Sequence, residues 1–95
     1  DTIQKVVANH YNISLSDIKG VKRNKKIAYS RHIAIYIARI LTESSFNEIA
    51  AEFGGKDHST IMHSYNTIEL QLKTDESLNS TIDLLIREIK DYKKL

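Results

Sequence analysis

The sequence predicts an all-α domain of about six helices, and three observations lead to this prediction. Proline is absent from the 95 residues and only three glycines occur, so helices can run without interruption and turns are few. Apolar side chains recur at helical spacing in successive segments. No segment alternates apolar and polar residues between turn signals, as a half-buried strand would. The length fits one compact domain over residues 1–95.

Local signals predict three helices in the first half of the chain. Thr2 is the expected N-cap of a helix over residues 3–11. The apolar face of this helix consists of Ile3, Val6, Val7 and His10. Ser14 begins a short helical turn that ends at Gly20. A central helix follows over residues 28–42, with alanines that let a neighbouring helix approach closely. Its apolar side chains are Ile33, Tyr36, Ile37, Ile40 and Leu41.

A capping-box pattern starts the next helix. Ser45 and Glu48 have the S-x-x-E spacing in which each side chain accepts from the other residue's free backbone N–H. We therefore expect a two-turn helix that begins at Phe46. Its apolar face consists of Phe46, Ile49, Ala50 and Phe53. Gly54 and Gly55 end this helix, because glycine adopts backbone angles that other residues resist.

Two longer helices complete the chain. Asp57 is expected to cap a helix that runs to about Lys73. The apolar face of that helix consists of Ile61, Met62, Tyr65, Ile68 and Leu72. A last helix, at about residues 75–93, packs through Leu78, Ile82, Leu85, Ile89 and Tyr92. The segment at about residues 46–73 thus has the layout of a DNA-binding helix-turn-helix, which many purely structural helix pairs share.

The net charge of +2 conceals a segregation of charge along the chain. Seven bases and no acid lie between Lys19 and Arg39, whereas ten acids face six bases from Glu43 onward. The bases are densest in a loop at about residues 19–27. Such a cationic segment indicates a polyanionic partner, most commonly a phosphate backbone, with a solvated surface loop as the alternative.

Composition and motifs exclude several classes of protein. The chain has no cysteine, which rules out disulfides and thiolate metal sites and favours the cytoplasm. No apolar run approaches the roughly 20 residues that a membrane span requires, so no membrane contact is expected. The histidines form no H-x-x-x-H frame and no Walker A motif occurs, so we expect no enzyme activity, metal or cofactor in this chain. The missing initiator Met suggests a fragment of a larger protein.

Polar side chains crowd the start of the second helix of the predicted helix-turn-helix. They are Lys56, Asp57, His58, Ser59 and Thr60. In a recognition helix this first turn contacts base edges in the major groove. The Asp57 carboxylate can accept from a cytosine amino group, His58 can touch thymine, and Ser59 can serve either base. Thr60 and His63 are better placed for phosphates.

These residues also have purely structural interpretations. Asp57 can act only as a helix cap, which is worth about 1 kcal/mol. His58 can be an ordinary exposed residue, and His63 a partly buried one with a satisfied hydrogen bond. Single-stranded RNA binding would favour exposed stacking aromatics, whereas the aromatic residues here fall on apolar helix faces. Those residues are Tyr36, Phe46, Phe53, Tyr65 and Tyr92. A helix-turn-helix transcriptional regulator is the main alternative function.

Residues 51–64, AEFGGKDHSTIMHS, resemble the signature of the bacterial chromosomal replication initiator DnaA family. The resemblance extends from Ile3 through the basic segment at residues 22–26 to the last helix, and it is to the C-terminal domain of that family. It implies a six-helix, Trp-repressor-like helix-turn-helix domain. It also implies sequence-specific binding of nine-base-pair DnaA boxes in duplex DNA at a replication origin, a step that precedes strand opening.

The resemblance also implies particular contacts with DNA. It places Asp57, His58 and Ser59 on base edges in the major groove. It places Arg23 in the adjacent minor groove, which is narrow and strongly negative where the DNA is A·T-rich and therefore attracts an inserted arginine. The positions that contact phosphates in the family correspond to Lys25, Arg31, His32, Arg39, Thr42, Thr60 and His63. The phosphate contacts that we add from charge are Lys26 and Lys56.

The chain departs from the usual family pattern at five positions. Ser30 and His32 stand where the family usually has the Pro and Gln of Pro-Arg-Gln. Asn47 replaces a frequent Pro, Lys56 a usual Arg and Ser59 a usual Thr. Because a serine lacks the methyl group that would pack on thymine, we expect a related but not necessarily identical DNA site.

The resemblance further implies a wider setting for this domain. The parent protein would bind ATP through an AAA+ domain outside these residues and would oligomerise on the origin, in the bacterial cytoplasm at the nucleoid. The fragment itself is expected to bind one site as a monomer, since a module that reads both grooves needs no two-fold symmetry.

Overall fold

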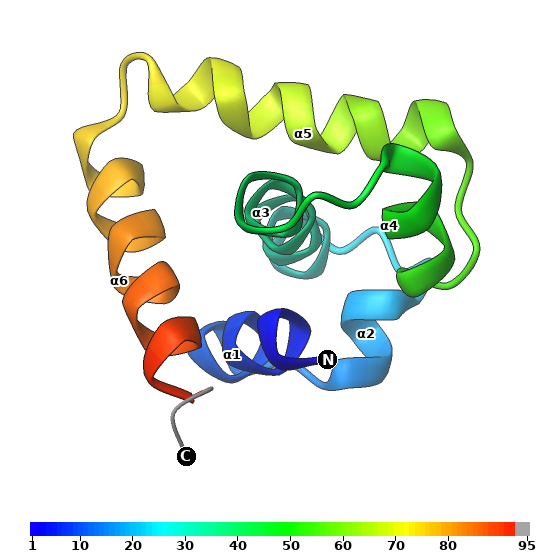
Figure 1. Ribbon diagram of the computed structural model, residues 1–95, viewed down its shortest axis with the longest axis horizontal. Coiled ribbons are helices and arrows are strands. Elements are labelled where there is room, and N and C mark those ends of the chain that lie inside the picture. The colour runs from blue at the N-terminus through cyan, green and yellow to red at the C-terminus, as the bar shows by residue number, and fades with distance from the viewer. Residues whose placement is uncertain (93–95) are drawn as a thin grey trace.

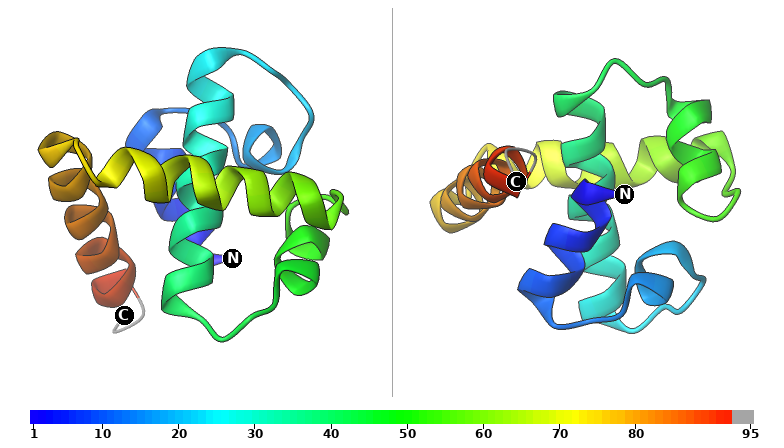
Figure 2. Two further views of the ribbon diagram at one scale, coloured as in Figure 1. Left: turned by 90° about the horizontal axis from the view of Figure 1, so that it is seen from above. Right: turned by 60° about the horizontal axis from the view of Figure 1, so that its bottom comes forward.

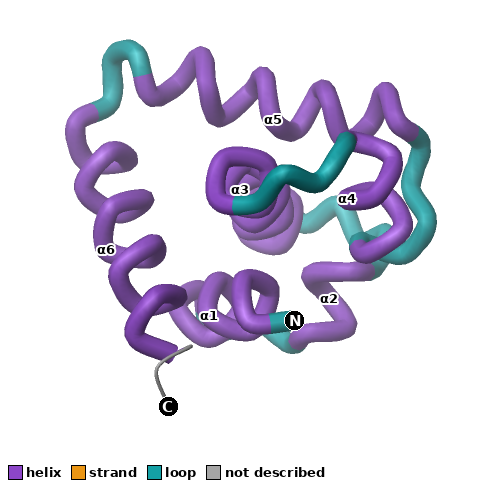
Figure 3. Tube along the Cα trace, in the orientation of Figure 1, coloured by secondary structure: helices purple, strands orange, loops and turns teal. Residues whose placement is uncertain are grey.

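The computed structural model describes residues 1–92, and these form six helices with no strand (Figure 3). The helices are α1 (Thr2–Tyr11), α2 (Leu15–Lys19), α3 (Lys25–Leu41), α4 (Phe46–Glu52), α5 (His58–Leu72) and α6 (Glu76–Tyr92). The predicted all-α class and the number of helices are confirmed. None of these helices is both long and apolar enough to span a lipid bilayer.

The central helix of the fold is α3, and every other helix contacts it. Figure 1 views α3 end-on, with α5 above it, α1 below it, α6 on one side, and α2 and α4 on the other. This enclosure explains why buried residues occur around much of the circumference of α3, more than the single apolar stripe of a surface helix would provide. They are Ser30, Arg31, Ile33, Ala34, Ile35, Ile37 and Ala38.

The first helix begins one residue earlier than predicted, because Asp1 caps it in place of Thr2. The Asp1 carboxylate accepts from the backbone N–H of Ile3 at 2.9 Å and of Gln4 at 3.3 Å. His10 was assigned to the apolar face but is exposed. The Gln4 side chain is buried in this helix and donates to the Glu52 carbonyl at 2.9 Å. A side-chain amide that donates to a carbonyl can thus be buried at a position that the spacing of apolar residues does not mark as buried.

The central helix starts three residues earlier than predicted, which shortens the basic loop. Asn24 is its N-cap, and the side-chain oxygen accepts from the N–H of Lys26 at 2.9 Å and of Ile27 at 3.4 Å. Lys25 and Lys26 therefore lie on the first turn of α3, and the loop itself covers residues 21–24. The prediction was wrong here because it required apolar periodicity, which the polar first turn of a capped helix lacks.

The predicted apolar faces are mostly confirmed, with errors at their edges. Ile40, Met62 and Tyr92 were expected in the core but are 42%, 37% and 48% exposed. Helical spacing identifies the middle of a buried face, whereas its edges depend on how far the neighbouring helix reaches. In the last helix the other four predicted core residues, Leu78, Ile82, Leu85 and Ile89, are buried. Its predicted end at about residue 93 lies outside the described residues.

Candidate nucleic-acid interface

The predicted helix-turn-helix is formed by α4 and α5. Ser45 caps α4 through a complete capping box: the Glu48 N–H donates to the Ser45 hydroxyl, and the Ser45 N–H donates to the Glu48 carboxylate. In the turn that follows, Gly54 and Gly55 have φ of 87° and 75°, the left-handed region that favours glycine. In the left view of Figure 2, the start of α5 lies between α4 and the loop that precedes α3.

Asp57 lies at the N-cap position of α5, as predicted, but its side chain makes no capping hydrogen bond. The expected cap bond is therefore wrong. Sequence places the residue ahead of the first turn, but it does not determine the rotamer of an exposed carboxylate. Both carboxylate oxygens are consequently available to an external donor such as a base amino group.

The first turn of α5 presents its polar side chains to solvent. His58, Ser59 and Thr60 are exposed, and Ile61 is the first fully buried side chain of the helix. The His58 ring packs edge-on against Phe46 of α4, with 5.7 Å between the ring centroids. This contact restrains the imidazole and leaves the residue exposed.

A groove of about 600 Å³ joins the basic loop to the start of α5. Its walls from the loop and α3 are Val21, Lys22, Arg23, Ala28, Arg31 and His32. Its walls from the α4–α5 turn and α5 are Gly54, Gly55, Lys56, Asp57, Thr60 and His63. The groove brings together residues more than 30 positions apart that were predicted to touch DNA.

Cationic side chains border the loop side of this groove. Arg23, Lys25 and Lys26 are exposed, and a neighbouring hollow that all three line has a mostly apolar floor of Ala28 and Tyr29. Two lysines on the first turn of a helix oppose the helix dipole, which favours negative charge at that end. Their placement thus lowers the stability of α3 slightly and fits a surface that receives an anion.

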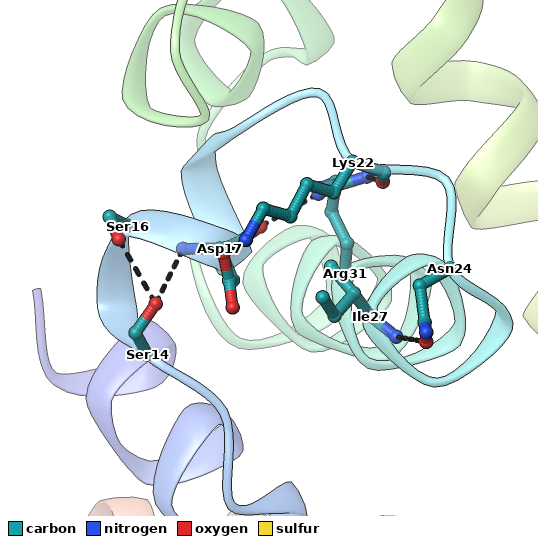
Figure 4. Close-up of polar contacts among 7 residues, drawn as sticks. All are labelled: Ser14, Ser16, Asp17, Lys22, Asn24, Ile27 and Arg31. Carbon is teal, nitrogen blue, oxygen red and sulfur yellow. Dashed lines mark hydrogen bonds and ion pairs between the residues drawn. The ribbon is translucent and has the colours of Figure 1, made fainter.

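Arg31 is only 7% exposed, although it was predicted to contact a phosphate. Its guanidinium donates to the carbonyls of Ile18 at 3.0 Å, Lys22 at 3.1 Å and Asp17 at 2.7 Å. Figure 4 shows the side chain rising from α3 toward Lys22 and the end of α2. Burial lowers the pKa of Arg31, and the charge of Asp17 opposes this shift. The contact of Arg31 with a phosphate stays a prediction. The three hydrogen bonds of its guanidinium connect the loop to α2.

His32 lies half-buried beside this groove. Its Nδ1 is 2.7 Å from the Ser64 hydroxyl, and its ring stands edge-on to the exposed His63 at 6.2 Å between centroids. Burial lowers the pKa of His32, and the charges of His63 and Arg31 lower it further. The structural interpretation of His63 as a partly buried residue is wrong. If Nδ1 of His32 accepts from Ser64, its Nε2–H remains a donor toward the groove.

Lys56 is half-buried in the α4–α5 turn. Its ammonium donates to the carbonyl of Lys19 at 2.9 Å and to that of Phe53 at 2.6 Å. Burial lowers its pKa, and the charge of Arg31 lowers it further. The predicted phosphate contact of Lys56 is not tested by these bonds, but they account for two of its three donors.

Arg39 and Thr42 lie at the opposite end of α3 from the basic loop. Arg39 donates to the Ser44 carbonyl at 2.9 Å, and its guanidinium lies 4.1 Å from the centroid of the Phe46 ring. The Thr42 hydroxyl donates to the Ala38 carbonyl and accepts from the Ser44 N–H at 3.2 Å. These bonds join the end of α3 to the segment before α4.

The aromatic residues predicted as core differ in their burial. Phe53 is 1% exposed, whereas Phe46, Tyr36 and Tyr65 are half-buried. Tyr36 stacks on Tyr65 with 5.2 Å between ring centroids, and Phe46 meets Tyr65 edge-on at 5.7 Å. Their ring faces are engaged with one another, as expected for side chains that join α3, α4 and α5.

Sequence reasoning missed three residues of this surface. Val21, 84% exposed, and Lys22 line the groove, and Lys22 forms an ion pair of 3.3 Å with Asp17. Ser64 is buried and orients His32. The sequence did offer a signal for Val21, because it is an apolar residue inside a cationic segment and has no apolar partners at helical spacing. No local signal marks Ser64, because His32 lies on a different helix.

Metal ligands are not assembled in the part of the chain that the structure describes. Over residues 1–92, no three His, Asp or Glu side chains are grouped so that they could hold a metal ion.

Comparisons with known proteins agree with this architecture. The sequence family described as the bacterial dnaA protein helix-turn-helix matches residues 1–68. The chain is 47% identical over 91 residues to the chromosomal replication initiator protein DnaA of two strains of Treponema pallidum, one of them the Nichols strain. These matches cover 96% of this chain and 20% of each relative, so the chain spans about a fifth of their length. A crystal structure of a DNA replication initiation factor superposes with a TM-score of 0.85 at 33% identity, over 95% of this chain and 27% of the other.

Proposed function

The chain belongs to the family of bacterial DnaA helix-turn-helix domains, and on this premise we propose that it binds DnaA boxes in duplex DNA during initiation of chromosome replication. In this proposal the chain supplies sequence recognition. ATP binding and oligomerisation on the origin belong to segments of the longer relatives that it does not cover. The protein therefore works in the bacterial cytoplasm, at the nucleoid.

One observation carries the proposal: a single groove is walled by the exposed loop with Arg23 on one side and by the start of α5 with Asp57 on the other. A recognition helix reads base edges through its first residues. An arginine on an adjacent loop suits a narrow minor groove, whose potential is strongly negative. With both segments on one face, the domain can read two successive grooves of one duplex without a dimer partner.

The proposed base contacts are Arg23 in the minor groove and Asp57, His58 and Ser59 in the major groove. The exposed Asp57 carboxylate makes no cap bond, so it is available to accept from a cytosine amino group. His58 rests on Phe46, which keeps its ring near the start of the helix, where it can touch thymine.

The proposed backbone contacts lie on both sides of the recognition helix. We call Arg23, Lys25, Lys26 and Arg39 the interface cations. Lys25 and Arg39 lie about 21 Å apart along α3, at 1.5 Å per residue, so they can hold the duplex on either side of the helix start. The remaining proposed phosphate contacts are His32, Thr42, Thr60 and His63. Arg31 and Lys56 are left out, because three of the five Arg31 donors and two of the three Lys56 donors bond to backbone carbonyls.

The proposal is tested by selecting bound duplexes from a random library with the chain. The expected result is enrichment of a TTATNCACA-like consensus, with one protein molecule per site. A consensus unrelated to the DnaA box would favour the helix-turn-helix transcriptional regulator. Binding without sequence preference would refute the proposal.

A matched pair of substitutions tests how base and phosphate contacts are assigned. Arg23→Ala is expected to weaken binding by about 1–3 kcal/mol and to relax discrimination at the positions it reads. Arg39→Ala is expected to weaken all duplexes alike, because phosphates carry no sequence information. The measurement is the dissociation constant on the selected consensus and on its single-base variants. A changed consensus with Arg39→Ala would contradict the assignment.

A further inference from the structure

We propose that Arg31 and Lys56 are positioning residues that act through the carboxyl end of α2, where they hold the loop carrying Arg23 in register with the helix-turn-helix. The inference rests on the proposed function. It assigns the buried Arg31 and the half-buried Lys56 to fixing the position of the two groove-reading segments relative to each other, and not to phosphate contacts.

The carboxyl end of α2, a helix of five residues, offers several backbone carbonyls as hydrogen-bond acceptors. The last carbonyls of any helix lack intrahelical partners and carry partial negative charge. In α2, three consecutive carbonyls accept from cations: those of Asp17 and Ile18 from Arg31, and that of Lys19 from Lys56. Charge-assisted bonds of this kind are roughly twice as strong as neutral ones.

Each cation also bonds to one of the segments that face DNA. Arg31 donates to the carbonyl of Lys22, in the loop next to Arg23. Lys56 donates to the carbonyl of Phe53, at the C-cap of α4. The short helix α2 is therefore the common attachment point of the basic loop and the α4–α5 turn.

Backbone packing at the same point supports this attachment. Gly54, with φ of 87°, lies so close to α2 that a Cβ atom there would clash with the Lys19 carbonyl oxygen. The Lys22 ammonium, in the loop, pairs with the Asp17 carboxylate of α2 at 3.3 Å. The turn and the loop thus both contact the carboxyl-terminal part of α2.

This arrangement bears on affinity because a preformed pair of segments loses less freedom on binding. The burial of two neighbouring cations disfavours both charges, and burial together with the charge of Arg31 lowers the pKa of Lys56. Three carbonyls of α2 and one from each attached segment compensate that cost. If Lys56 left for a phosphate, the Lys19 carbonyl would lose its cationic partner and the turn would lose this hydrogen bond to α2.

The test compares Lys56→Met with the matched control Lys26→Met in the 95-residue chain. Dissociation constants are measured on a TTATNCACA-like duplex and on a scrambled duplex, at several salt concentrations. Lys26, exposed and proposed to contact a phosphate, should lose roughly one unit of slope in log K against log salt. Lys56→Met should keep the wild-type slope and lose more affinity for the matched duplex than for the scrambled one. A slope loss like that of Lys26→Met would overturn the inference.

Coupling between the loop and the helix-turn-helix is measured by the loss of affinity that Arg23→Ala causes in different backgrounds. In the wild-type background this change is expected to weaken binding to the matched duplex by roughly 5- to 150-fold. In the Lys56→Met background the loss should be smaller, because the loop no longer presents Arg23 in register. Lys56→Arg, which keeps a cationic donor, should restore the wild-type loss. An equal loss in all three backgrounds would overturn the inference.

Folding and the proposed function are controlled separately. Thermal melts identify any variant that is unfolded at the assay temperature, and Lys56→Gln then replaces Lys56→Met, because its amide keeps one donor. A wild-type chain with no preference for the matched duplex would refute the proposed function before any variant is measured. A wild-type preference combined with unchanged Arg23 coupling would refute only the positioning role.

Discussion

Asp57→Ala and Ser45→Ala both replace the residue that precedes a helix, yet the structure predicts opposite consequences. Ser45 caps α4 with a complete capping box, in which its hydroxyl accepts from the Glu48 N–H at 3.1 Å. Asp57 precedes α5 without any side-chain cap bond. Ser45→Ala therefore removes a bond that stabilises the fold, whereas Asp57→Ala removes a carboxylate proposed to contact a base.

The expected magnitudes follow from these bonds. Loss of a serine N-cap costs about 0.5–2 kcal/mol. For a domain of this size, each 1 kcal/mol lowers Tm by about 4–8 °C. Asp57→Ala forfeits only the attraction of an exposed charge to the helix dipole, about 0.3–1 kcal/mol, so its Tm should fall less. On DNA, Asp57→Ala should reduce discrimination at one base pair by about 1–3 kcal/mol, while Ser45→Ala should leave discrimination intact.

Calorimetric melts measure the first effect, and fluorescence anisotropy with the matched duplex and its single-base variants measures the second. The salt dependence of Asp57→Ala should equal that of the wild type, because no cation is removed. The reasoning is refuted if Asp57→Ala lowers Tm as much as Ser45→Ala and leaves every base preference unchanged. In that case Asp57 would be a structural residue and the base contact would be wrong.

Three further predictions concern the turn, the groove and the charge of the interface. Gly55→Ala should lower the free energy of unfolding by about 1–2 kcal/mol, because residue 55 has a left-handed backbone. Gly54→Ala should lower it by about 1–3 kcal/mol more, because the new Cβ would also meet the Lys19 carbonyl. Equal losses for the two variants in denaturant unfolding would contradict this. Since burial lowers the folded-state pKa of His32 below that of the unfolded chain, stability should fall as pH drops below about 6.5. His32→Gln should make stability less dependent on pH. If Tm of the wild-type chain did not change between neutral and mildly acidic pH, this prediction would be wrong. With three interface cations proposed to contact phosphates, Lys25, Lys26 and Arg39, at about −0.9 each, log K should fall with log salt at a slope of about −2.7. A slope near zero would show that the basic segment is only a solvated surface.

Several features of the fold were predictable because the residues that produce them are close in sequence. The capping box at residues 45–48 and the paired glycines at 54–55 each determine backbone geometry over a few positions, and both were confirmed. Apolar periodicity likewise identified the buried middle of α6. One error arose because two adjacent residues, Asp1 and Thr2, could each cap the first helix. Another arose because Asn24 caps a helix whose first turn is polar and so shows no apolar spacing.

The candidate site was predictable in its residue types and only partly in its geometry. The polar first turn of α5 and the exposed cations of the loop were visible as patterns, and the structure places Arg23, Asp57 and Thr60 along one groove. The rotamer of Asp57 and the pairing of His32 with Ser64 were not visible. The first depends on solvent, and the second joins two helices that no sequence pattern relates.

The sequence by itself determined the helical class, the positions of the turns and the concentration of positive charge before the helix-turn-helix, because each of these depends on neighbouring residues or on composition. Only the tertiary structure decided which cations, in that segment and in the turn after α4, bond to the protein's own backbone. Arg31 and Lys56 reach backbone carbonyls 13 and 37 positions away. Every residue has a carbonyl, so no pattern of side chains marks the ones that folding brings to a buried cation.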